Sequence, residues 1–351
     1  MNNGSALARD ATTLNFPGAM FQLAGGLLGG ENSTLTNAGT INLTGPAGLH
    51  SIFVNNGTII ESGAGDNNDN SGQLYNYGVY EIQNNGGTQL NYFNNFGLLE
   101  KTGGSGTSVI NSFVNNSGAI QATNGTLSFI KTFNQNAGTL QITPAITFTN
   151  GTFYLNGGMV TGVGAVDESI YAEGGVMAPG SPFGTLKVNE YDSYGGPNCT
   201  LNIVLGGTNK FSQLAVSGGV ILHGTLNVTL TNGYVPAIGT QFQIISCANR
   251  ANGFDILNVP AGIAVTYSNN GVYLIVTGST PVQLQTPKIS GGNFVFSFGT
   301  TNGLGYTVQQ NADLTTTNWT YYTNLIGNGS LYQVISSVTN FPQRFFRVSQ
   351  P

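Results

Sequence analysis

Short apolar runs recur along the first half of the chain at intervals of about twenty residues. Seven times an asparagine is followed two residues later by a glycine, and these glycines lie 18, 21, 19, 21, 20 and 20 residues apart. The second residue after each glycine is apolar, and the third is polar in six of the seven copies. This alternation, kept in register from copy to copy, predicts short stacked strands. The seven asparagines are Asn37, Asn55, Asn76, Asn95, Asn116, Asn136 and Asn156.

A repeat of this length favours a parallel β-solenoid in which each coil holds two or three short strands. Coils then stack at the inter-strand spacing of about 4.8 Å, so like residues lie on like residues. The asparagines are therefore expected to form a ladder of hydrogen-bonded amides. The recurring glycine is expected at a corner with a positive φ. One-residue differences in the interval are also expected at corners, because a slip within a strand would turn its side chains to the wrong face.

The pattern changes after Gly158, which suggests further parts of the chain, all of them β. Longer alternating strands come first, then a segment with two prolines, and then strands at hairpin-like intervals that suggest a fibronectin- or immunoglobulin-like sandwich. Trp319 is expected to anchor the core of this sandwich. The expected organisation is an N-terminal cap or first coil at 1–30, the β-solenoid at 31–177, a β-rich continuation at 178–278, a linker at 279–287 and a small β-sandwich at 288–351.

Three segments of the continuation carry a resemblance to a known family: APGSPFGTLKV, FSQLAVSGGVILHGTLNVTL and GYVPAIGTQFQII. They resemble the block that ends many autotransporter passengers, with its autotransporter-associated repeat, and the match covers about residues 174–278. The end of the chain is similar to C-terminal modules of large secreted surface proteins from bacteria of the Verrucomicrobia type. The resemblance implies a β-helix, right-handed in its commoner form, and an extracellular or cell-surface location. It supplies no catalytic residues.

Charge and the lengths of the apolar runs argue against a nucleic-acid partner and against a membrane-spanning segment. Only 7% of the residues are charged, the net charge is −5, and the nine basic residues are scattered. A nucleic-acid-binding protein needs a basic face to neutralise phosphates, so no nucleic-acid partner is expected. No apolar run approaches the roughly eighteen residues of a membrane-spanning helix, so no membrane-spanning segment is expected.

Candidate chemistry is sparse. Glu81 and Glu100 occupy the same outward position of successive copies, which would place their carboxylates about 5 Å apart, the separation found in retaining glycosidases. The alternative is a pair of surface charges, with Lys101 nearby, that discourages lateral sheet association. Asp66 and Asp69 lie in DNNDN, which resembles the start of a calcium loop without the later glycine and glutamate of an EF-hand. A simple bulged loop is the alternative there.

The remaining candidates are two cysteines in separate apolar strands. Cys199 and Cys247 could form a disulfide if their strands are neighbours, and could equally be two buried thiols. No metal site and no cofactor are expected. Taken together, the sequence suggests an extracellular structural or adhesive surface protein without enzymatic activity. Its expected partners are surface or matrix components, or further copies joined end to end in a fibre. The alternative is a β-helix that binds or degrades polysaccharide.

Overall fold

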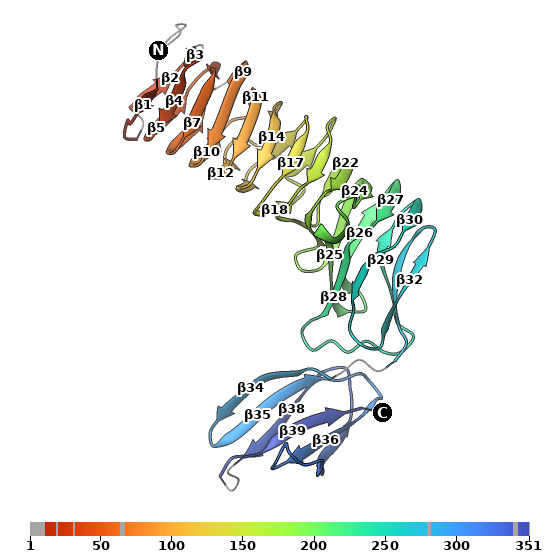
Figure 1. Ribbon diagram of the computed structural model, residues 1–351. Coiled ribbons are helices and arrows are strands. Elements are labelled where there is room, and N and C mark those ends of the chain that lie inside the picture. The colour runs from red at the N-terminus through yellow and green to blue at the C-terminus, as the bar shows by residue number, and fades with distance from the viewer. Residues whose placement is uncertain are drawn as a thin grey trace.

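The computed structural model describes residues 11–18, 20–30, 32–63, 67–278, 282–339 and 343–350, with the backbone alone at 67–69. The chain is all-β, with 61% of its residues in strands. Figure 1 shows a curved rod of stacked coils that leads to a smaller C-terminal domain. The predicted all-β solenoid is therefore confirmed.

The rod consists of about ten coils, and a regular coil contributes one short strand to each of three faces. Parallel pairing between like strands of successive coils builds each face, as β4 with β7, β5 with β8 and β3 with β6 show. The strands of the first coils are β1 (Thr12–Leu14), β2 (Phe21–Leu23), β3 (Gly26–Leu28), β4 (Thr34–Asn37), β5 (Thr40–Leu43), β6 (Ala47–Leu49), β7 (Ile52–Asn55), β8 (Thr58–Glu61), β9 (Asn67–Asn76), β10 (Val79–Ile82), β11 (Thr88–Asn95), β12 (Leu98–Lys101) and β13 (Thr107–Ile110).

The middle of the rod repeats the same arrangement. The long strand β11 runs through a corner and serves two faces, which its pairing with both β13 and β14 on one side shows. The strands here are β14 (Phe113–Asn116), β15 (Ala119–Ala122), β16 (Thr126–Phe129), β17 (Phe133–Gln135), β18 (Thr139–Ile142), β19 (Ile146–Phe148), β20 (Phe153–Leu155), β21 (Met159–Gly162), β22 (Ala165–Ala172) and β23 (Gly175–Pro179).

Parallel stacking continues through the expected β-rich continuation, with longer coils. Strand β25 pairs in parallel with β28, and β28 with β31, while one antiparallel hairpin joins β25 to β26. At the end, β33 pairs antiparallel with both β29 and β32. The elements are β24 (Gly184–Asp192), the 3-10 helix η1 (Gly196–Asn198), β25 (Cys199–Gly207), β26 (Lys210–Val216), β27 (Gly219–Leu222), β28 (Thr225–Leu230), β29 (Gln241–Ser246), β30 (Asn249–Asn252), β31 (Ile256–Asn258), β32 (Ile263–Ser268) and β33 (Gly271–Val276).

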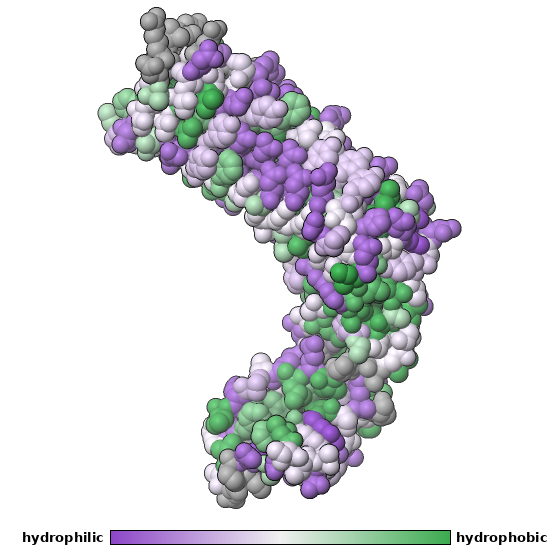
Figure 2. All heavy atoms as spheres, in the orientation of Figure 1, coloured by the Kyte–Doolittle hydropathy of each residue, from purple (hydrophilic) through white to green (hydrophobic). Residues whose placement is uncertain are grey.

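One hydrophobic core runs through the whole rod, from Leu23 to Val276. Its members alternate with outward residues along each strand, and aromatic rings from successive coils stack inside it, as Phe133 and Phe153 do at 5.1 Å between centroids. On the face that Figure 2 shows, hydrophilic residues cover much of the N-terminal half of the rod. Hydrophobic residues gather where β26 and β29 lie and on the C-terminal domain.

The repeated glycine has a different role from the one expected. Positive φ values occur at Gly138 and Gly158 (+69° and +66°) and not at the first five glycines of the series. At those five positions, which are Gly39, Gly57, Gly78, Gly97 and Gly118, an added Cβ would lie 2.0 to 2.3 Å from a carbonyl oxygen of the preceding coil. Glycine is therefore required there because two backbones approach closely at the corner, as well as for its freedom in φ at the later coils.

Replacing Gly97 with alanine is expected to destabilise the rod by about 1–3 kcal/mol or more, because the new methyl group cannot be accommodated without moving backbone. Its Cβ would lie 2.1 Å from the carbonyl oxygen of Gly78. Urea unfolding followed by circular dichroism measures the effect. Gly207→Ala is the control, since its nearest neighbour is the Lys210 Cβ at 3.4 Å; equal stability of the two variants would contradict the prediction.

The C-terminal domain consists of two three-stranded antiparallel sheets, compatible with a β-sandwich. Its own core is formed by Phe296, Phe298, Tyr306, Val308 and Val334. The sheets have the orders β34–β35–β38 and β37–β36–β39. The strands are β34 (Leu284–Ser290), β35 (Asn293–Gly299), β36 (Gly305–Asn311), β37 (Thr320–Ile326), β38 (Leu331–Ser337) and β39 (Phe345–Ser349).

Two expectations for this domain were wrong. Strand β34 begins at Leu284, inside the expected linker, and a register shift between Gln285 and Lys288 lets this edge strand contain Pro287; prolines are tolerated at sheet edges and bulges. Trp319 does not anchor the core. It is half-buried and packs against the guanidinium of Arg347, whose Cζ lies 4.4 Å from the ring centroid.

Candidate functional site

A ladder of buried amides runs along one corner of the rod. Each Nδ2 donates to the amide oxygen of the next coil, at 2.7 to 2.8 Å from Asn37 to Asn116. Asn76 also donates to the carbonyl oxygen of Leu98 at 3.0 Å, and Asn55 to that of Val79 at 2.9 Å. The amides are fully buried. They therefore join neighbouring coils and also tie the two sides of the corner together.

The ladder departs from the expected one after Asn116. Asn116 donates to the Oε1 of Gln135 at 2.8 Å, and Gln135 is the residue paired with Asn116 in the sheet. Asn136 and Asn156 are exposed, and the side-chain amide of Asn156 donates to Asn136 Oδ1 at 2.9 Å in a pair separate from the ladder. The cause is one extra residue in this corner, since three residues separate β17 from β18 where two separate β14 from β15. The length difference lies at a corner, as expected, and it moves the asparagine out of the buried position.

Inside the rod lies a polar cluster that the sequence reasoning missed, the interior polar cluster of Glu61, Tyr80, Thr88, Lys101 and Ser108. Glu61 is only 2% exposed. Its Oε2 accepts hydrogen bonds from the Tyr80 hydroxyl at 2.9 Å and from Thr88 Oγ1 at 3.1 Å. A buried carboxylate requires such donors to offset its desolvation.

Lys101 is the basic member of the interior polar cluster and is fully buried. Its Nζ donates to the carbonyl oxygens of Asn84 (2.5 Å) and Gly103 (2.8 Å) and to Ser108 Oγ (3.0 Å). Burial lowers the pKa of the Lys101 ammonium, and the negative charge of Glu61 partly offsets this. The two charges lie in one inward column, with Ile82 between them. Because both are enclosed by the coils, neither charge is accessible to a ligand from outside the rod.

A signal for this cluster was present in the sequence. Lys101 is two residues after the buried Leu99, and Glu61 is two residues after the buried Ile59. Alternation in a strand therefore points both side chains inward. The expectation that Lys101 is a surface neighbour of the two outward glutamates was wrong for this reason.

Glu81 and Glu100 are direct partners on β10 and β12, and both are half-buried on the outer face. Each carboxylate has its own hydrogen-bond donors. Glu81 Oε1 accepts from Gln83 at 2.9 Å and from Thr102 at 2.5 Å. Glu100 Oε2 accepts from Gln121 Nε2 at 2.7 Å. The geometry places two carboxylates on neighbouring coils, each fixed by polar neighbours.

The other candidates gain no chemical role. Asp66 lies outside the described residues, and Asp69 belongs to β9, where its side chain is not described. Cys199 and Cys247 are buried free thiols, and burial raises the pKa of both. Among the described residues, no group of three potential metal-ligating side chains is arranged around a common point.

A second amide ladder lies on the outer face, and we call it the amide strip: Asn94, Asn115 and Asn134. Asn115 donates to Asn94 Oδ1 at 2.8 Å, and Asn134 donates to Asn115 Oδ1 at 2.9 Å. Tyr92 and Phe113, 39% and 38% exposed, flank the strip two residues before Asn94 and Asn115. Their rings lie 5.6 Å apart.

A second aromatic pair lies along the corner on the other side of the amide strip. The rings of Tyr77 and Phe96 stack at 4.8 Å with an interplanar angle of 10°, and they are 54% and 45% exposed. The outer face thus presents amides between two rows of aromatic rings, with a repeat of one coil. Such a surface can form many similar contacts along the rod.

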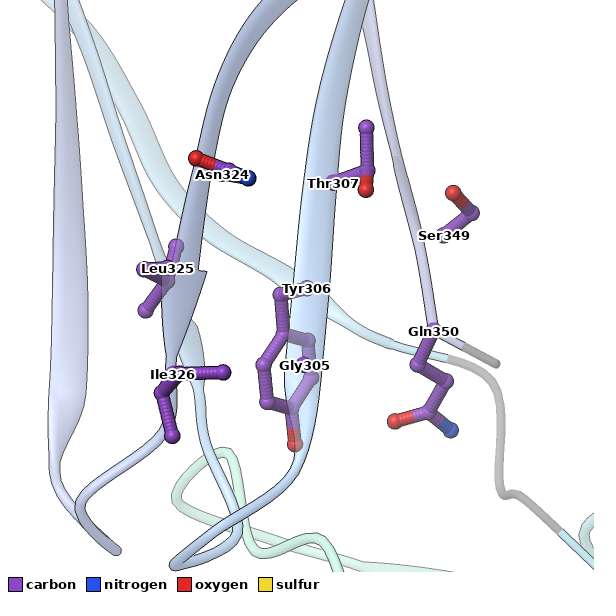
Figure 3. Close-up of a pocket in the computed structure, with 8 residues that line it drawn as sticks. All are labelled: Gly305, Tyr306, Thr307, Asn324, Leu325, Ile326, Ser349 and Gln350. Atoms are coloured by element: carbon purple, nitrogen blue, oxygen red, sulfur yellow. The ribbon is translucent and has the colours of Figure 1, made fainter.

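The C-terminal domain holds a hollow of about 390 Å³ on sheet β37–β36–β39. Figure 3 shows its lining residues, with Thr307 and Gly305 on β36, Asn324 and Ile326 on β37, and Ser349 near the end of β39. Hydroxyl and amide groups line it together with the apolar side chains of Leu325 and Ile326. This arrangement suits a ligand that offers several hydrogen-bonding groups.

Within the described part of the chain, no helix is both long and apolar enough to cross a membrane. No protein-family model matches this sequence, and no curated protein matches it.

Proposed function

We propose that this chain is an extracellular or cell-surface rod with a structural or adhesive role, comparable to the β-helical passengers of autotransporters. The amide strip with its flanking aromatic rings supports this proposal best. A surface of amides and aromatic rings that repeats over successive coils suits multiple weak contacts with a surface or matrix component. The continuous core and the buried amide ladder keep such a rod stiff.

We further propose that the chain has no enzymatic activity. Glu81 and Glu100 are engaged by Gln83, Thr102 and Gln121, and the charged pair inside the rod is enclosed. The wild-type chain and the variants Glu81→Gln and Glu100→Gln are all expected to show no turnover of any substrate on a panel of polysaccharides. Turnover by the wild-type chain that either substitution abolishes would instead establish the alternative function, a polysaccharide-degrading β-helix.

Location tests the proposal directly. Treating intact cells of the source organism with a protease is expected to release fragments of this chain, because a surface rod is accessible from outside. Electron microscopy with antibodies to the rod should place it at the cell exterior. Recovery of the intact chain only from the cell interior would contradict the proposal.

Self-association belongs to the same proposal. Growth of a fibre by strand-edge contacts needs an open edge at both ends. The antiparallel strands β32 and β33 cover only β29 at the C-terminal end, while β30 and β31 each pair with one strand of the coil before them. At the other end, β2 pairs with β5 alone among the described strands. Part of the strand edge is therefore open at each end, which favours end-to-end growth into a fibre. Sedimentation is expected to show polymers whose length increases with concentration; a chain that stays monomeric at high concentration would contradict this.

A further inference from the structure

The outer face of sheet β37–β36–β39 brings aromatic, amide and basic side chains together. Strand register places Tyr321, Gln309 and Arg347 in one row across the three strands. Asn324, Thr307 and Ser349 form the next row. The hollow of Figure 3 lies along this second row, where Gly305 leaves room beside Ile326.

Arg347 is held in a fixed orientation on this face. Its Cζ lies 4.4 Å from the centroid of the Trp319 ring, and its Nε donates to Gln309 Oε1 at 2.8 Å. Stacking on an aromatic ring and a hydrogen bond at Nε orient the planar guanidinium. Neither contact uses the N–H groups of its two terminal nitrogens. Such a preorganised fork matches the geometry of a carboxylate.

The two aromatic residues of this face are accessible to solvent to different extents. Trp319 is half-buried beside Arg347, and Tyr321 is 62% exposed. The Tyr321 hydroxyl donates to Asn324 Oδ1 at 3.2 Å, which links the aromatic row to the hollow. Exposed tryptophan and tyrosine offer a rigid apolar surface with a polar rim. The C–H face of a pyranose ring is complementary to such a surface.

The charge of the domain is opposite in sign to that of the whole chain. Residues 282–351 contain Lys288, Arg344 and Arg347, and Asp313 is their one acidic side chain, while the chain as a whole carries −5. Asp313 is engaged by the backbone and hydroxyl of Thr315 in its own turn. The positive charge of Arg347 is therefore available to an anionic ligand.

We propose that this face binds a saccharide that carries a carboxylate, such as the hexuronate units of an acidic polysaccharide. Arg347 receives the carboxylate, while the aromatic side chains contact the apolar face of the sugar ring. Asn324, Thr307 and Ser349 bond to its hydroxyl groups. The inference goes beyond the proposed role of the rod and does not depend on it.

The experiment uses the full chain, in which Trp319 is the only tryptophan, so fluorescence excited at the red edge of the tryptophan band, where tyrosine does not absorb, reports on this face. Oligogalacturonate is expected to change the emission saturably, with heat of binding in parallel calorimetry, and binding should weaken as salt screens the charge. The matched neutral galactose oligomer is expected to bind at least about tenfold more weakly, because charge-assisted hydrogen bonds are the stronger ones.

Variants test the named contact. Arg347→Gln should weaken oligogalacturonate binding by about tenfold or more, and Arg347→Lys by less, because lysine keeps the charge and loses the fork. Arg344→Gln is the control: it removes the same charge from a residue that bonds to Ser336, and its affinity should match the wild type. No binding by either method, equal affinity for the neutral oligomer, or undiminished affinity of Arg347→Gln would each overturn the inference. A chain found only inside cells would count against the proposed function and would leave these titrations unaffected.

Discussion

Replacing Asn76 with alanine is expected to lower the free energy of unfolding of the rod by roughly 2–5 kcal/mol. The substitution removes the acceptor of Asn55 and the donor to both Asn95 and Leu98. These groups are buried where water cannot replace the lost partner, so each retains its desolvation cost. Urea unfolding monitored by circular dichroism provides the measurement.

The matched control for this prediction comes from the same repeat. Asn136 occupies the corresponding place in its copy of the sequence but is exposed, and its side-chain amide bonds to Asn156. Asn136→Ala is expected to change the stability by no more than about 0.5 kcal/mol. If Asn76→Ala were equally mild, the buried ladder would contribute little to stability.

Replacing Lys101 with methionine is expected to destabilise the rod by about 3–5 kcal/mol. Methionine fills much of the same space but removes the ammonium donor from the carbonyl oxygen of Gly103 and leaves that of Asn84 with Ser108 alone. It also removes the positive charge that faces Glu61 within the core. Removing one member of a buried charged pair costs more than the pair contributes.

The double variant separates these two causes. Glu61→Gln removes the negative charge while its amide oxygen can still accept from Tyr80 and Thr88, which now bond to the carboxylate. Adding Glu61→Gln to Lys101→Met is therefore expected to restore part of the lost stability. Fully additive losses in the double variant would show that the two charges do not interact.

Much of the rod could be predicted from the sequence. The spacing of Asn-x-Gly and the alternation around it predict the stacked strands, the register of like residues on successive coils and the ladder from Asn37 to Asn116. These features follow from the period of a strand and from the repeat, both of which are local properties. The same alternation also predicts that the side chains of Glu61 and Lys101 point inward, although their charge suggested a surface position.

The outer contact surfaces could not be predicted in the same way. The amide strip depends on which outward columns adjoin across coils, and the site in the C-terminal domain depends on strands far apart in sequence. Arg347 meets Gln309 because β39 pairs with β36. Trp319 looked like a core residue because tryptophan is large and apolar, whereas the phenylalanines of β35 already fill that core.

The sequence by itself determined that the chain is a solenoid, which residues face inward along most strands, and where the repeat changes. Only the tertiary structure decided why glycine recurs, because the limiting contact at Gly97 is with the backbone of the coil before it. It also decided that one extra corner residue moves Asn136 out of the ladder and puts Gln135 in its place. Periodicity fixes which face a residue takes within its own strand, whereas the distances between coils and between sheets exist only once the chain has folded.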